Sequence, residues 1–98
     1  MLADQLQADL RQAMKDRDAV RVSTLRLALA ALRNRQIELR QRPGESSLPD
    51  SETVDVLRRE AKCRQESIAA FQSGGRPDLA EKEAAEFAVL QKYLPAEL

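Results

Sequence analysis

The chain is 98 residues long and carries 16 basic and 16 acidic side chains, one cysteine and no histidine, so its formal net charge is zero. The absence of histidine excludes Ser-His-Asp triads, Cys-His pairs and imidazole metal sites. A single cysteine excludes an internal disulfide and a multi-thiolate zinc site. We therefore predict a single domain over residues 1–98 with no catalytic residue, no metal site and no cofactor.

The composition favours an all-α protein. Good helix formers such as Ala, Leu, Arg, Gln and Glu dominate, and only 3% of the residues are aromatic. Helix-breaking residues gather at a few points, which are Pro43, Gly44 and Pro49, then Gly74, Gly75 and Pro77, and finally Pro95. With a weaker break near residues 16–18, they predict four helices at residues 3–15, 18–41, 51–73 and 77–93.

The first two predicted helices each carry an apolar stripe. In the first, apolar residues recur at spacings of three and four, at Leu2, Leu6, Leu10, Ala13 and Met14. The second is expected to begin with Asp18 as its N-cap, because a short carboxylate accepts free backbone N–H groups. Its stripe consists of Leu25, Ala28, Leu29 and Leu32, with Leu39 further on.

The third and fourth helices follow the same logic. Asp50 is the predicted N-cap of the third, and Gly74 and Gly75 are expected to end it in the left-handed conformation. Its seam is Val54, Leu57, Ala61, Ile68 and Phe71, with Arg64 in the remaining position. Pro77 and Asp78 suit the start of the fourth helix. Its stripe is Ala80, Ala84, Phe87, Leu90 and Leu94.

Each helix must bury one face, so we predict a four-helix antiparallel bundle. The polar loop at residues 42–50 is its most mobile predicted segment. No apolar run approaches the ~20 residues of a membrane span, so no membrane partner is expected.

Net neutrality conceals a basic region. Residues 11–42 hold nine basic side chains against three acidic ones, a local net charge of +6. Arginine forks onto phosphate, so this region is a candidate surface for a nucleic-acid backbone. The alternative is an ordinary solvated helix face, partly neutralised by acidic neighbours.

A second basic group lies in the third helix. Arg58, Arg59, Lys62 and Arg64 are either an anion-binding cluster or, for Arg64, half of a structural ion pair with Glu83 or Glu86. Cys63 between them fits an inert filler better than a nucleophile. The carboxylates of Glu81, Glu83 and Glu86 fit an exposed face better than a cation site.

Longer motifs carry a resemblance to a known family. They comprise the stretch 56–68, Phe71, Gly75-Arg76-Pro77-Asp78-Leu79, Glu81-Lys82-Glu83, Glu86, Leu90 and Tyr93-Leu94-Pro95, preceded by Leu6, Asp9, Ala13-Met14-Lys15, Asp18, Leu25-Arg26 and Ala30-Ala31-Leu32. Over essentially all 98 residues the chain resembles the YqeY-like family, which is related to the tail domain of GatB, a subunit of the aspartyl/glutamyl-tRNA amidotransferase.

The resemblance implies a helical bundle joined to a smaller helical subdomain, which we expect to be missing beyond Leu98. It also implies tRNA contact, and a family label of glutamine-dependent carbon–nitrogen ligase. The positions that carry over are Lys62, Arg64, Ser67, Arg76 and Glu83.

The favoured function is a non-catalytic tRNA- or RNA-binding accessory module. Its predicted phosphate-binding residues are Arg21, Arg26, Arg33, Arg35 and Arg40, joined by Arg58, Lys62, Arg64 and Arg76. The alternatives are a component of an amidotransferase activity, and a module for a protein partner or for homo-oligomer formation. A single free thiol suits a reducing cytosol, so a cytoplasmic location is predicted.

Overall fold

The computed structural model describes residues 1–39 and 48–95. Within these residues it contains four α-helices and no strand, which confirms the all-α prediction. The helices are α1 (Leu2–Lys15), α2 (Ala19–Glu38), α3 (Asp50–Ser73) and α4 (Pro77–Gln91). Most of the loop predicted at residues 42–50 lies outside the described residues.

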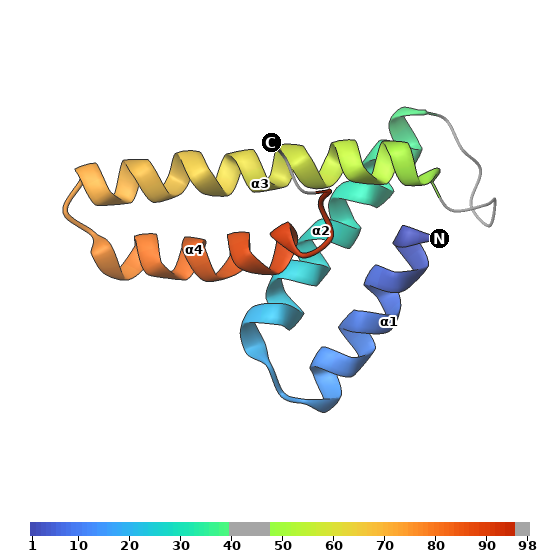
Figure 1. The fold of residues 1–98 in the computed structure, drawn as a ribbon, viewed down its shortest axis with the longest axis horizontal. Coiled ribbons are helices and arrows are strands. Elements are labelled where there is room, and N and C mark those ends of the chain that lie inside the picture. The colour runs from blue at the N-terminus through green and yellow to red at the C-terminus, as the bar shows by residue number, and fades with distance from the viewer. Residues whose placement is uncertain (40–47, 96–98) are drawn as a thin grey trace.

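The helices form two antiparallel pairs that cross each other (Figure 1). One pair is α1 with α2, and the other is α3 with α4. Helices α2 and α3 each contact all three other helices, and so they connect the two pairs. The buried residues of α2, which are Thr24, Leu25, Ala28 and Leu32, lie on the side that packs against the other helices.

The helix starts follow local chemistry, with one correction. Asp18 caps α2 as predicted, because its carboxylate accepts the backbone N–H of Arg21 at 3.2 Å. Asp50 is not the cap of α3, because Pro49 occupies that position and α3 begins at Asp50 itself. The Asp50 carboxylate instead accepts the backbone N–H of Leu2 at 2.9 Å, which ties the start of α1 to the start of α3.

The helix ends differ slightly from the predicted ones. Helix α2 ends at Glu38, with Leu39 as its C-cap, and α4 ends at Gln91, where the chain tightens into turns. Of the two glycines after α3, only Gly75 is left-handed, at a φ of 73°, whereas Gly74 has a φ of −84°. Pro77 opens α4 as predicted.

The core confirms most of the predicted stripes. The largest fully buried apolar side chains are Leu6, Leu25, Leu48, Leu57 and Leu90. Met14, Leu39 and Ala84 were expected inside but are exposed. Met14 and Leu39 lie at helix ends, whereas Ala84 lies in the middle of α4 on a position that faces solvent.

Candidate nucleic-acid interface

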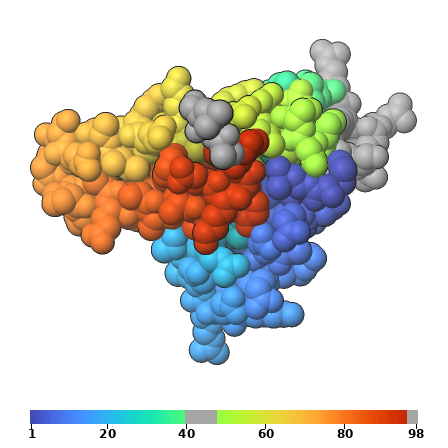
Figure 2. Space-filling view, viewed as in Figure 1, coloured from blue at the N-terminus to red at the C-terminus, as the bar shows by residue number. Residues whose placement is uncertain are grey.

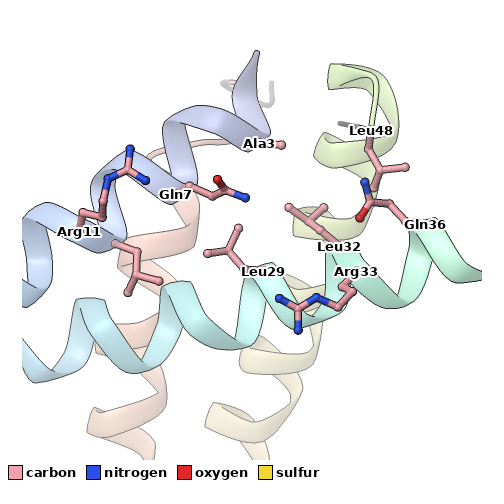
Figure 3. A pocket seen from close by; sticks show the side chains of 9 residues that line it. Ala3, Gln7, Arg11, Leu29, Leu32, Arg33, Gln36 and Leu48 are labelled. Atoms are coloured by element: carbon pink, nitrogen blue, oxygen red, sulfur yellow. The ribbon is translucent and has the colours of Figure 1, made fainter. Parts of the chain in front are cut away.

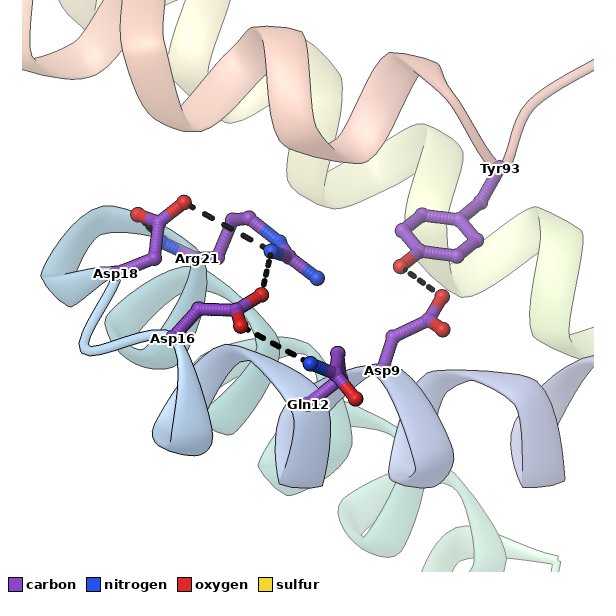
Figure 4. Close-up of polar contacts among 6 residues, drawn as sticks. All are labelled: Asp9, Gln12, Asp16, Asp18, Arg21 and Tyr93. Atoms are coloured by element: carbon purple, nitrogen blue, oxygen red, sulfur yellow. Dashed lines mark hydrogen bonds and ion pairs between the residues drawn. The ribbon is translucent and has the colours of Figure 1, made fainter.

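Several predicted phosphate-binding residues already have acidic partners. The Arg21 guanidinium lies 3.3 Å from the Asp16 carboxylate and 3.9 Å from that of Asp18, across the α1–α2 turn (Figure 4). Arg76 pairs with Asp78 at 3.1 Å, and its hydrogen bond holds the pKa of that carboxyl below its usual value. These arginines stabilise the local turns.

Arg35 joins α2 to α3. Its guanidinium donates to Glu52 of α3 at 3.0 Å and to Glu38 at 2.9 Å. The hydrogen bond to Glu52 raises the pKa of Arg35, and the same bond lowers the pKa of Glu52. Arg35 is therefore positioned by two carboxylates and holds two helices together.

Arg64 lies on the face of α3 that packs against α4, at the one position of the predicted apolar seam that a charged residue occupies. It lies 3.4 Å from Glu86, 3.9 Å from Glu83 and 3.6 Å from Glu60, and only 12% of its side chain is exposed. The predicted ion pair between α3 and α4 is confirmed. Glu83 and Glu86 are thus engaged with an arginine, and the described residues contain no cluster of potential metal ligands.

The rest of the α3 group faces outward. Arg58 pairs with Asp55 at 3.7 Å, while Lys62 is exposed. Both line a groove of about 730 Å³ whose apolar wall includes Phe87 and Leu94 of the α4 end. Cys63 is also exposed on α3.

A groove between α1 and α2 brings together residues far apart in sequence. It has a volume of about 310 Å³, and Leu10, Leu29 and Leu32 are among its apolar lining residues. Figure 3 shows Leu29 and Leu32. Arg11 of α1 and Arg33 of α2 line the groove, as do Gln7 and Gln36. None of the described residues that line this groove is acidic.

Both arginines of this groove, Arg11 and Arg33, and Arg26 on the same helix as Arg33, lack an acidic partner among the described residues. Arg26 and Arg33 are seven residues apart, so they share one face of α2. Arg40, also predicted to bind phosphate, lies outside the described residues. Among the predicted α2 arginines, Arg26 and Arg33 are therefore open to an external anion.

Sequence reasoning counted Arg11 in the basic region 11–42 but did not select it as a site residue, and it missed Gln7 and Gln36. The signal that could have found them is the antiparallel pairing of the first two helices, because their apolar stripes then meet and Arg11 and Arg33 lie beside Leu10 and Leu29 in one groove. A further unforeseen contact joins the end of α4 to α1, where the Tyr93 hydroxyl donates to Asp9 at 2.5 Å (Figure 4). Burial, followed by this hydrogen bond, raises the pKa of Tyr93.

Similar proteins place the chain in a family context. The family model for Yqey-like protein matches residues 3–98. The chain is 34% identical over 91 residues to "Altered inheritance of mitochondria protein 41, mitochondrial" of Eremothecium gossypii, covering 93% of this chain and 48% of that protein. The proteins of the same name from Kluyveromyces lactis and Candida glabrata are 34% and 32% identical, over 93% and 91% of this chain and 47% of each relative. The chain spans about half the length of the curated relatives it matches.

These names contradict one prediction and leave the fold assignment intact. The relatives are named as mitochondrial proteins, so the predicted cytoplasmic location is wrong. A lone thiol indicates a reducing compartment and does not distinguish one such compartment from another.

In the described residues no helix has the length and apolarity needed to cross a membrane. With a family model that matches from residue 3 to residue 98, the chain belongs to the YqeY-like family.

Proposed function

We propose that this chain is a non-catalytic accessory module that binds RNA through phosphates held at the α1–α2 groove. The proposal rests on one observation: Arg11 and Arg33 line the same groove, and no carboxylate among the described residues neutralises them. The side-chain amides of Gln7 and Gln36 add neutral N–H donors beside the two cations.

The remaining chemistry of the groove agrees with contact to the RNA backbone. Its floor is aliphatic, and none of its lining residues is aromatic, so it offers no platform on which bases could stack. Recognition would then depend on charge and on the shape of the RNA. The relation to the GatB tail that the sequence resemblance implies favours tRNA as the RNA.

An amide-transferring activity has less support in the residues of this chain. Cys63 is its single thiol and lies exposed on α3. The sequence has no histidine to serve as a general base. Glutaminase activity of the isolated chain would favour this alternative over RNA binding.

The test is a fluorescence-anisotropy titration of labelled tRNA at several salt concentrations. We expect the double variant R11Q/R33Q to bind tRNA about tenfold or more weakly than the parent chain. We also expect the slope of log K against log salt concentration to become shallower by the amount that corresponds to about two lost phosphate contacts. The matched control is K82Q/K92Q, which removes two positive charges from exposed positions near the other helix pair. This control should keep the salt slope of the parent chain.

Two results would overturn the proposal. One is the absence of tRNA binding at low salt. The other is an equal loss of affinity in R11Q/R33Q and K82Q/K92Q, because that would show a response to overall charge and not to the groove.

A further inference from the structure

Helix α2 carries a second seam on the side opposite its buried stripe. Residues spaced three and four apart all face outward and are exposed, and they are Val20, Ser23, Leu27, Ala30, Asn34 and Ile37. The exposed fractions of Leu27 and Ile37 are 49% and 67%. The outward side of a surface helix is normally polar, so this face has an unusual share of apolar surface.

The outward seam is distinct from the core. The buried residues of α2 pack against the other three helices, and little of the middle of α2 is visible from the side on which those helices lie (Figure 2). The outward seam is therefore not part of the contacts that hold this fold together. It is a different surface from the phosphate groove proposed above, and Arg33 lies at the border between the two.

The spacing of the seam identifies the kind of partner. Residues spaced alternately three and four apart form a continuous seam along one side of a helix. In a coiled coil, such a seam packs against a second helix whose seam residues have the same spacing. The two polar seam residues, Ser23 and Asn34, restrict the partner further. A partner helix must place polar groups opposite Ser23 and Asn34 along the helix axis. A second α2 that lies parallel and in register does so by symmetry, because its own Ser23 and Asn34 then face them.

The charges beside the seam favour the parallel orientation. Arg26 and Arg33 lie along one side of it, and Glu38 lies at the end of the other side. An antiparallel pair would set the two arginine rows against each other, whereas a parallel pair brings Arg33 beside Glu38 of the second copy. Glu38 has 60% of its side chain exposed and can accept a second donor. The five N–H donors of Arg33 can serve this carboxylate and a phosphate together.

We propose that two copies of this chain pair through the outward faces of α2, parallel and in register, to form a homodimer. Sedimentation velocity over a range of concentrations is the first measurement. The parent chain is expected to approach twice its monomer mass of 11.0 kDa. L27E and I37E are expected to remain monomeric, and circular dichroism shows whether each retains the helical fold.

Met14→Glu is the matched control, because Met14 is an exposed apolar residue on α1 away from the seam. It should dimerise like the parent. Orientation is tested by S23C in a Cys63→Ser background, since parallel pairing brings the two Ser23 positions together and mild oxidation should give a covalent dimer.

A parent chain that stays monomeric at high concentration would overturn the proposal. So would a folded L27E or I37E variant that dimerises as well as the parent, or an S23C variant that dimerises without cross-linking. The tRNA titration of R11Q/R33Q is read separately, so failure of the dimer leaves the RNA-binding proposal to its own test.

Discussion

Replacing Arg64 with methionine removes the cation that lies among three glutamates between α3 and α4. Methionine keeps the length and flexibility of the aliphatic stem, so the change isolates the charge from the packing. Glu86, which is 9% exposed at its side chain, then loses the guanidinium at 3.4 Å and is left facing Glu83 and Glu60.

The size of the effect follows from burial. Two opposite charges ~4 Å apart attract by ~4 kcal/mol near a protein surface, and desolvation offsets much of this. Removing one partner of a buried pair costs ~3–5 kcal/mol, but Glu60 and Glu83 are 24% and 23% exposed and can regain water. We therefore expect R64M to lower the free energy of unfolding by about 2–4 kcal/mol.

Urea unfolding at neutral pH, followed by circular dichroism, measures this loss. R64M/E86L should recover much of the stability, because it also removes the buried anion that R64M leaves unpaired. Arg59→Met is the matched control, since Arg59 is exposed on the same helix and should change stability by no more than ~0.5 kcal/mol. A folded R64M variant as stable as the parent would refute the reasoning.

Four further predictions concern stability and use the same unfolding assay. Leu57→Ala should cost about 2–5 kcal/mol, because Leu57 is fully buried, and a loss below ~1 kcal/mol would contradict its place in the core. Thr24→Val should add ~1 kcal/mol, because the Thr24 hydroxyl is buried without a hydrogen-bond partner, and destabilisation would show that this hydroxyl is bonded. Gly75→Ala should cost ~1 kcal/mol through its φ of 73°, with Gly75→Asn costing less, and equal stability of all three chains would argue against a left-handed turn. Arg35 lowers the pKa of Glu52, so this pair stabilises the fold above the usual carboxyl pKa of 4.5 and loses its effect as the pH falls through the lowered value. Glu52→Gln should therefore weaken the dependence of stability on pH in the acid range, and an unchanged dependence would exclude that contribution.

The sequence predicted those features that depend on neighbouring residues. Asp18 as a cap and Pro77 as a helix start follow from backbone chemistry within one turn, and both are confirmed. The pairing of Arg64 with α4 was also foreseeable, because an arginine on an apolar seam needs a carboxylate and the next helix offers Glu83 and Glu86.

Features that depend on how the helix pairs cross could not be predicted. Leu48 and Val56 are buried although the periodicity did not select them, because the face that each segment turns inward is set by tertiary packing. The groove of Arg11 and Arg33 likewise depends on the register between α1 and α2. Their predicted role in phosphate binding remains a prediction until the titrations are made.

The pairing of each helix with its neighbour along the chain also bears on how the protein reaches its fold. Helix α1 packs mainly on α2, and α3 on α4, so most native contacts join residues close in sequence. Long-range closure is required for the docking of the two pairs on each other, including the bond from Leu2 to Asp50 and the bond from Tyr93 to Asp9. Such a topology loses little chain entropy before its contacts form, and helical proteins of this kind fold in microseconds to milliseconds. The newly made chain would therefore expose its apolar stripes only briefly.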